Sequence, residues 1–337
     1  MSKYSDLKIF HYPEFISNLP TGTNPPLHVR IKLTNHCNHN CNYCAFRIKS
    51  NPLSHAVNQQ DSIPFNKLLD IIQDLRDMGT KAITFSGAGE PCMYPKFPEI
   101  IRRLSPIKFA MLTNGALFKG EIADLFARYG SWVRVSIDGW DRESYKKFRG
   151  VDDFDKVIEN IMNFKSDNCK LGVNIVVTKE NAHHLYELYK TLSKAYLHSI
   201  KISPCLPSDS VAKNIEYHKP IAKIVDHQIR KILKESQIVS NTYREQLTSF
   251  VKDYNWCPNI QIQPVIAADQ NIYSCHDLAF RKEGLIGSFK NCSFREAWEK
   301  ADKFKIDPRN VCKNHCMAHK KNEIILSYMD IDHREFV

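Results

Sequence analysis

Three cysteines, Cys37, Cys41 and Cys44, fall within one eight-residue window of the sequence. Clustered thiols in a chain without an export signal suggest a metal centre. Structural zinc takes four ligands in a closed tetrahedron, so His36 or His39 would have to complete such a site. A [4Fe–4S] cluster binds one thiolate per iron, so three cysteines leave one iron open for a further ligand. The C-x3-C-x2-C spacing is uncommon for zinc and favours the cluster, with zinc as the alternative.

A second set of cysteines lies in the last quarter of the chain, at Cys257, Cys275, Cys312 and Cys316. The chain has 337 residues and 11 cysteines, but a chain this long can bury a core without disulfides, and no export signal points to an oxidising compartment. The first twenty residues lack a signal-peptide pattern, and no apolar run reaches the ~18–20 residues that span a bilayer. We therefore expect a soluble, cytoplasmic protein with no membrane partner.

Lysine and arginine outnumber aspartate and glutamate by 47 to 37, which gives a formal net charge of +10. A basic balance suits anionic partners such as nucleotides or sugar phosphates. The positive charges are spread along the chain without a run of five or more, which is typical of a solvated surface. Nucleic acid is therefore not the expected partner, whereas a small polar or anionic substrate is.

Six short β-rich runs alternate with amphipathic segments between residues 28 and 205. Segment Phe65–Met78, for example, places four apolar residues on one helical stripe and ends at Gly79. Alternating strands and helices predict parallel strands with right-handed crossovers. Six repeats are two short of a closed barrel, so we expect an α/β fold, a partial (β/α)6 TIM-like barrel with its chemistry at the carboxyl ends of the strands. The predicted strands are Val29–Thr34, Ala82–Ser86, Lys108–Thr113, Trp132–Ile137, Leu171–Thr178 and Ser199–Ser203.

The remaining sequence predicts a small α+β, cysteine-rich domain. Residues 208–256 are polar and helical in composition, with Pro220–Ser236 as the best helix and no strand pattern. Further on, we expect strands at Ile260–Ile266, Asn271–Ser274 and Gly284–Phe289, a helix at Ser293–Asp302 and a loop-rich tail. The expected divisions are an N-terminal extension over 1–27, the barrel over 28–207, a helical linker over 208–256 and the cysteine-rich domain over 257–337.

The first cysteine motif reads C-x3-C-x-aromatic-C directly after the first predicted strand. In that position it resembles the motif of the radical S-adenosylmethionine (SAM) superfamily. The resemblance covers residues 28–205, and Ala88 stands where the family's first glycine is usual. Further segments resemble landmarks of the family in order at the strand ends: Ser86-Gly87-Ala88-Gly89-Glu90-Pro91, Thr113-Asn114-Gly115, Ser136-Ile137-Asp138-Gly139 and Arg149-Gly150.

This resemblance implies that Cys37, Cys41 and Cys44 hold a [4Fe–4S] cluster whose open iron binds the amine and carboxylate of SAM. Members of the family cleave SAM reductively, and the 5′-deoxyadenosyl radical abstracts a hydrogen atom from the substrate. The cofactor supplies the radical, and the protein supplies orientation and exclusion of water. The resemblance places the following residues at SAM: Tyr43, Gly87, Ala88, Gly89, Glu90, Pro91, Asn114, Ser136, Asp138 and Asn174.

The sequence around the second cysteine set is similar to the SPASM/twitch auxiliary-cluster domain of many radical SAM enzymes. There a short hairpin and a helix hold one or two further [4Fe–4S] clusters. Cys257, Cys275, Cys312 and Cys316 suffice for one cluster, so the shorter twitch form is expected, with zinc as the alternative. The residues before Cys275 lack the usual glycine and the last pair is C-x3-C, so incomplete cysteine ligation remains open.

These patterns together predict a radical SAM oxidoreductase. An auxiliary cluster beside the substrate would accept the second electron of the substrate oxidation. A flavodoxin or ferredoxin would supply the electron that SAM cleavage consumes. Only about 27 residues precede the first strand, which favours a small polar metabolite such as a sugar or aminocyclitol over a ribosomal peptide. An epimerase with Cys205, or less favourably Cys92, as the hydrogen donor is an alternative. A zinc-stabilised nucleic-acid-binding protein is the remote one.

Overall fold

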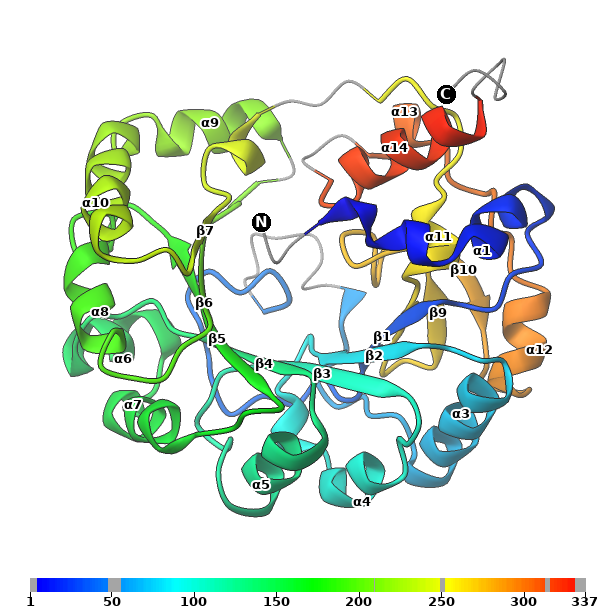
Figure 1. Ribbon diagram of the computed structural model, residues 1–337, viewed down its shortest axis with the longest axis horizontal. Helices are drawn as coiled ribbons and strands as arrows, with labels where there is room; N and C mark the ends of the chain where they lie inside the picture. Colours follow the sequence, from blue (N-terminus) through cyan, green and yellow to red (C-terminus); the bar gives the residue numbers. More distant parts are fainter. Residues whose placement is uncertain (1–4, 48–55, 209, 249–251, 313–315, 331–337) are drawn as a thin grey trace.

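Six parallel strands follow one another in chain order and form the wall of a partial barrel (Figure 1). The computed structural model describes residues 5–47, 56–208, 210–248, 252–312 and 316–330. Each strand pairs in parallel with the next along the chain. The six strands are β1 (His28–Lys32), β2 (Ala82–Ser86), β3 (Lys108–Thr113), β4 (Trp132–Ser136), β5 (Lys170–Val177) and β6 (Ser199–Pro204). The predicted partial TIM-like barrel is confirmed.

Helices cover the outer face of this sheet (Figure 1). The predicted apolar stripe of α3 (Phe65–Asp77) is buried, at Leu68, Ile71, Ile72 and Leu75. The sequence did not predict α4 (Phe97–Arg102) or α6 (Arg142–Arg149). The helix α4 and the short η3 (Pro91–Met93) lie in the connection after β2, and α6 lies in the connection after β4. The barrel helices are α3 (Phe65–Asp77), α4 (Phe97–Arg102), α5 (Gly120–Tyr129), α6 (Arg142–Arg149), α7 (Phe154–Asn163), α8 (Leu185–Leu192) and α10 (Ala222–Glu235).

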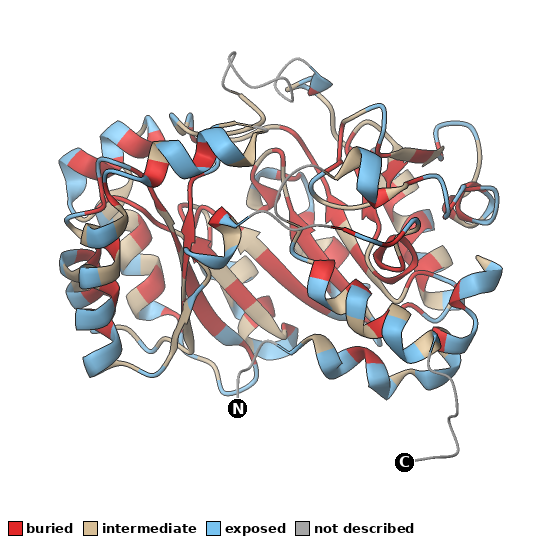
Figure 2. Ribbon diagram, turned by 90° about the horizontal axis from the view of Figure 1, so that it is seen from above, coloured by how far each residue is buried: buried red, intermediate tan, exposed pale blue. Residues whose placement is uncertain are grey.

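Alternation along the strands separates side chains that face the helices from side chains that face the lumen. Val29 and Ile31 on β1, and Val133 and Val135 on β4, belong to the main hydrophobic core, which follows the strands in Figure 2. The residues between them face the opposite way, into the barrel. A closed barrel of this type fills its interior with branched apolar side chains. Here the inward residues include Arg30, Lys32, Arg134, Ser136, Asn174 and Lys201, so the lumen is polar.

The C-terminal strands extend the same sheet beyond β1. β8 (Val265–Ile266) pairs in parallel with β1, and β9 (Asn271–Tyr273) pairs in antiparallel fashion with β8 and with β10 (Leu285–Ser288). α12 (Phe294–Glu299) follows, capped at Ser293, whose hydroxyl accepts the backbone N–H of Glu296 over 3.1 Å. The predicted hairpin and capped helix are therefore present, and their sheet is continuous with the barrel.

Three local predictions are wrong. The segment expected to lack strands contains β7 (Val239–Asn241), which pairs with β6 but is too short to show a pattern, together with α9 (Val211–His218) and η4 (Glu245–Leu247). The first half of the strand predicted at Ile260–Ile266 is a helical turn, α11 (Asn259–Ile262), which follows Pro258.

The tail expected to be loop-rich holds α13 (Pro308–Val311) and α14 (His319–Met329). The buried face of α14 includes His319 and Asn322, so no apolar period marks this helix.

The N-terminal residues pack against the C-terminal helix (Figure 1). They form η1 (Asp6–His11), α1 (Pro13–Ser17) and η2 (Leu19–Thr21). Ile9, Ile16 and Leu19 share a small core with Ile325 of α14 and Ile262 of α11. The predicted domain boundaries stay a prediction. None of the described helices is both long and apolar enough to cross a membrane.

Candidate active site

The loop with Cys37, Cys41 and Cys44 follows β1 at the carboxyl end of the barrel and is held by the end of α6. The backbone N–H of Asn40 donates to the carbonyl of Arg149, and that of Asn42 to the carbonyl of Phe148, each over 2.9 Å. Gly150 ends α6 with φ +70°, and a Cβ there would lie 2.8 Å from the carbonyl oxygen of Asn40. The Arg149-Gly150 pair at the end of α6 therefore fits closely against the cysteine loop, because glycine leaves room for the Asn40 carbonyl.

The segment after β2 holds the same loop from its other side. The N–H of Gly89 donates to the carbonyl of Thr34 over 3.2 Å, and the N–H of Glu90 to that of His36 over 2.8 Å. A Cβ on Gly89 would lie 2.0 Å from the carbonyl oxygen of His36. Glycine is therefore required at position 89 so that the two loops can touch.

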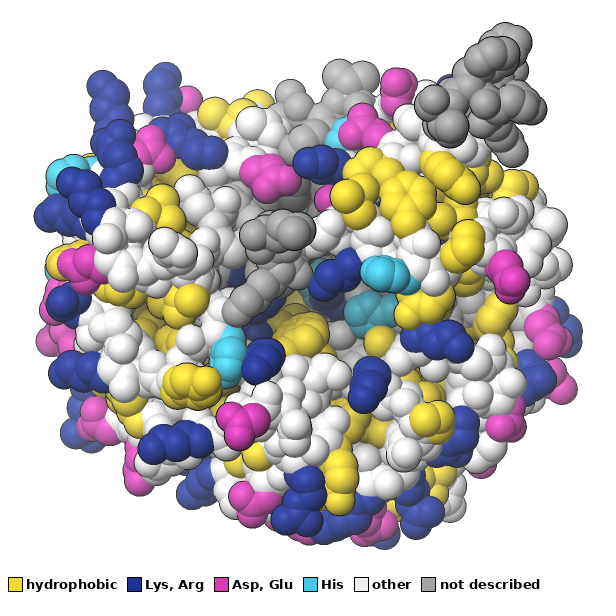
Figure 3. Space-filling view, in the orientation of Figure 1, with side chains coloured by type: hydrophobic (Ala, Val, Ile, Leu, Met, Phe, Trp, Pro, Cys, Tyr) yellow, Lys and Arg dark blue, Asp and Glu magenta, His cyan; other side chains and the backbone are white. Residues whose placement is uncertain are grey.

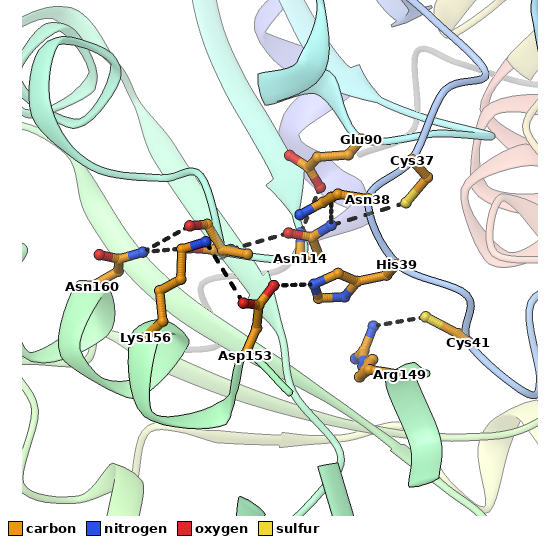
Figure 4. A network of polar contacts seen from close by, with 12 residues as sticks. Cys37, Asn38, His39, Cys41, Glu90, Asn114, Arg149, Asp153, Lys156 and Asn160 are labelled. Carbon is orange, nitrogen blue, oxygen red and sulfur yellow. Dashed lines mark hydrogen bonds and ion pairs between the residues drawn. The ribbon is translucent and has the colours of Figure 1, made fainter. Parts of the chain in front are cut away.

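Hydrogen-bond donors point at two of the three thiols (Figure 4). Arg149 Nη1 lies 3.6 Å from the sulfur of Cys41, and Asn114 Nδ2 lies 3.9 Å from the sulfur of Cys37. Burial raises the pKa of Cys37 to about 11 and also raises that of Cys44. Ligation by these thiols therefore releases protons, and the nearby donors favour the thiolate form that a metal requires.

Glu90 is buried, and its carboxylate accepts hydrogen bonds from neighbouring residues of the protein. One carboxylate oxygen accepts the Thr113 hydroxyl over 2.6 Å and the Cys92 N–H over 3.1 Å, and the other accepts the Asn114 N–H over 2.7 Å. Burial raises the pKa of Glu90, while these hydrogen bonds act in the opposite direction. Glu90 thus fixes the ends of β2 and β3 to each other, and its contact with SAM stays a prediction.

Asp138 is a buried junction between the cysteine loop and the sheet. One carboxylate oxygen accepts from both the Tyr43 hydroxyl and the Arg149 guanidinium, and the other accepts the Val176 N–H over 2.6 Å. The Arg149 guanidinium also lies 5.7 Å from the centre of the Tyr43 ring. The structure thus brings together three predicted residues in one network, with Asp138 as the shared acceptor.

The other residues assigned to SAM by resemblance lie along the same edge of the barrel. Ser136 and Asn174 are direct partners in the β4–β5 register, and both are half-buried. Pro91 begins η3, and Ala88 is buried. The carbonyl of Gly87 accepts from the ammonium of Lys32 over 3.0 Å. Lys32 was not singled out in the sequence, although its inward place on β1 follows from the alternation of that strand.

The four thiols of the second set line one cavity of about 480 Å³. Burial raises the pKa of Cys312 to about 11 and that of Cys316 to about 12, and it raises those of Cys257 and Cys275. In the described part of the chain, no three His, Cys, Asp or Glu side chains are close enough to hold a single metal ion. A [4Fe–4S] cluster does not need that convergence, because each thiolate binds a different iron. The donor set therefore fits a cluster.

The two proposed hydrogen donors have different surroundings. The sulfur of Cys92 lies 3.8 Å from the sulfur of Met111 and from the hydroxyl of Thr113, and the Cys92 N–H donates to the Glu90 carboxylate. Cys205 directly follows β6 and is buried, and its carbonyl accepts from His218 Nε2 over 2.7 Å. Burial raises the pKa of Cys205 to about 12, with Asp138 adding to the effect. The Cys205 thiol therefore keeps its proton at neutral pH.

A partial βα barrel with a three-cysteine loop after its first strand defines an enzyme that uses a SAM-binding iron–sulfur cluster. The family model of the Radical SAM superfamily matches residues 31–192, and the chain belongs to this superfamily. It is therefore a radical SAM enzyme that binds SAM and a [4Fe–4S] cluster.

Relatives of known name differ in their reactions. A probable GTP 3′,8-cyclase of Saccharolobus islandicus (strain M.14.25 / Kamchatka #1) is 26% identical over 275 residues, 80% of this chain and 83% of the relative. Fe-coproporphyrin III synthase of Methanosarcina barkeri (strain Fusaro / DSM 804) is 29% identical over 166 residues, 48% of this chain and 40% of the relative.

Solved structures share the fold at low sequence identity. Streptococcus suis SuiB bound to precursor peptide SuiA has a TM-score of 0.65 and 15% identity, over 92% of this chain and 73% of that one. Native anSMEcpe with bound AdoMet has a TM-score of 0.61 and 20% identity, over 83% of this chain and 82% of that one. At these identities the likeness concerns the fold.

Proposed function

We propose that this radical SAM enzyme holds one auxiliary [4Fe–4S] cluster on Cys257, Cys275, Cys312 and Cys316 and oxidises a small polar metabolite in the barrel lumen. One observation carries the proposal. The cavity that these four thiols line is also lined by the inward side chains Arg30 and Arg134. A substrate in the lumen would therefore lie between the loop that carries Cys37, Cys41 and Cys44 and the four thiols of the second set.

Cys37, Cys41 and Cys44 would hold the first cluster, and Ser136 and Asn174 would meet SAM from the inner face of the sheet. When bound, SAM and its cluster supply a 5′-deoxyadenosyl radical, which takes one hydrogen atom from the substrate. Loss of one more electron and one proton then completes a two-electron oxidation. The second cluster is proposed as the acceptor of that electron, and a flavodoxin or ferredoxin as the donor of the electron that SAM cleavage consumes.

Epimerisation is the second candidate, and Cys205 is the observation that favours it. Its thiol keeps its proton at neutral pH and lies near Asp138 at the carboxyl end of the barrel. A protonated thiol at that place could return a hydrogen atom to a substrate radical. Peptide modification is a further alternative, since SuiB, which shares the fold, was solved with a precursor peptide.

The hydrogen balance of the product separates these functions. The reconstituted enzyme is incubated in D₂O with SAM, dithionite and a protein-free extract of small metabolites, with Cys205→Ala alongside and Cys169→Ala as a buried-thiol control. Oxidation predicts a product two mass units lighter than the substrate, without carbon-bound deuterium, formed by all three proteins. A product one mass unit heavier than the substrate, with one carbon-bound deuterium and absent with Cys205→Ala, would show epimerisation instead. If the enzyme turns over a peptide and no small metabolite, the proposed substrate class is excluded.

A further inference from the structure

Cationic side chains line the lumen of the barrel. Arg30 and Lys32 come from β1, Arg134 from β4 and Lys201 from β6, at positions that alternate with residues of the main core. Lys201 is the direct neighbour of Asn174 in the β5–β6 register. Lys32 is buried, and the other three are half-buried. Figure 3 shows Lys, Arg and His side chains around the hollow at the centre of one face of the molecule.

Few acidic groups balance Arg30, Lys32 and Lys201. In the described part of the chain, the carboxylates that act on Arg30, Lys32 and Lys201 are those of Asp277 and Glu245. Cluster thiolates would compensate some of the charge, because a thiolate at Cys275 would attract the Arg30 guanidinium and one at Cys44 would attract the Lys32 ammonium. No cysteine acts on Lys201 among its described neighbours, and Arg134 and Arg30 repel it. Buried cations without compensation destabilise the folded state, which indicates that a ligand supplies the missing negative charge.

The lumen also contains unused hydrogen-bonding atoms. Arg30 Nε and the hydroxyls of Ser86 and Ser274 are buried without a hydrogen-bond partner in the described structure. Ser86 is the register partner of Lys32 on the inner face, and Ser274 lines the cavity together with Arg30. Buried polar atoms are normally paired, so unpaired ones beside a cavity point to a ligand that pairs with them.

We propose that the substrate carries a phosphate group, held in the lumen by Arg30, Lys32, Arg134 and Lys201. This inference rests on the proposed function, because it takes the lumen as the substrate site. Phosphate concentrates two negative charges on a few oxygen atoms, which suits Arg and Lys donors that converge from three strands. A neutral sugar or an uncharged peptide segment would add no negative charge to this group of cations.

Thermal unfolding of the anaerobically purified full chain tests the proposal, with millimolar inorganic pyrophosphate as the probe and citrate as the carboxylate comparison. The variants are Lys201→Met and Arg30→Met, and Lys223→Met, on the exposed face of α10, is the control. Pyrophosphate should raise the unfolding temperature of the wild type and of Lys223→Met, and citrate should do so less. Removing one lumen cation should weaken the apparent pyrophosphate affinity about tenfold or more. Without any anion, Lys201→Met should unfold at a higher temperature than the wild type.

Equal pyrophosphate stabilisation of the wild type and of both lumen variants would overturn the proposal, as would citrate stabilisation at least as strong. A lower unfolding temperature of Lys201→Met without anion would also contradict it, because Lys201 would then be a structural residue. If one lumen variant does not fold, the other gives the same comparison. A product one mass unit heavier than the substrate in D₂O would count against the proposed oxidation and would leave the pyrophosphate result unaffected.

Discussion

The side-chain amide of Asn322 on α14 lies 3.2 Å from the sulfur of Cys257 and donates a hydrogen bond to it. Its carbonyl oxygen accepts the backbone N–H of Asn259 over 3.2 Å, and the same amide lies 3.5 Å from the hydroxyl of Tyr254. Asn322 is fully buried. The C-terminal helix thus positions a donor at one of the four thiols proposed to hold the auxiliary cluster.

Replacing this donor should change the auxiliary cluster and leave the first one unchanged. An N–H···S bond stabilises the more negative, reduced state of a cluster, so Asn322→Leu should lower the potential of the auxiliary cluster. A difference of about 1.4 kcal/mol between the two oxidation states corresponds to about 59 mV for one electron. A redox titration followed by electron paramagnetic resonance measures this shift, with the exposed Asn163→Leu as the control. Unchanged potentials with full iron content would show that the contact does not act on a cluster.

Arg149 and Asp138 form a buried ion pair, which predicts a large loss of stability when it is broken. Arg149→Leu leaves the Asp138 carboxylate buried without its cation, and such a change destabilises a protein by about 3–5 kcal/mol. The matched control is Arg142→Leu, which removes an exposed pair with Asp152 and should change stability by about 0–1 kcal/mol. Denaturant unfolding measures both values. Similar losses in the two variants would mean that the Arg149 pair does not anchor the cysteine loop.

Lys201 predicts a pH dependence of stability. Burial, with repulsion by Arg134 and Arg30, lowers the pKa of Lys201 from 10.5 to about 8. The unfolded chain therefore binds more protons than the folded chain between these values, and stability rises with pH across this window. Below pH 8 the destabilisation by the charged lysine is fully present. Lys201→Met should therefore unfold at a higher temperature than the wild type at pH 7, and this difference should shrink as the pH approaches 10. A difference that is constant with pH would exclude this explanation.

The sequence was sufficient for the parts of the fold that depend on local pattern. β2 and β3 begin and end at the predicted residues because apolar alternation and flanking turns define them. The pairing of β8 with β1 was not predictable, because Val265–Ile266 is only two residues long and its partner lies more than two hundred residues away. α14 was missed because part of its buried face is polar.

The candidate site shows the same division. Cysteine spacing and the Gly89-Glu90 segment marked the first centre, and the structure brings them into contact. The sequence could not show that the Glu90 carboxylate is used by Thr113, Asn114 and Cys92, because that depends on how β2 and β3 end side by side. The cationic lumen was missed for a related reason. Its members are single basic residues on separate strands, and they converge when the barrel forms.

Iron content and SAM cleavage of cysteine variants test the two-cluster assignment most directly. The reconstituted wild type should hold about eight Fe per chain, from two four-iron clusters. Cys312→Ala/Cys316→Ala should hold about four Fe and still cleave SAM with dithionite, because the first cluster is intact. Cys37→Ala/Cys41→Ala/Cys44→Ala should also hold about four Fe and cleave none. Full iron content in the first variant would contradict the auxiliary cluster, and SAM cleavage by the second would contradict the assignment of the radical-forming site.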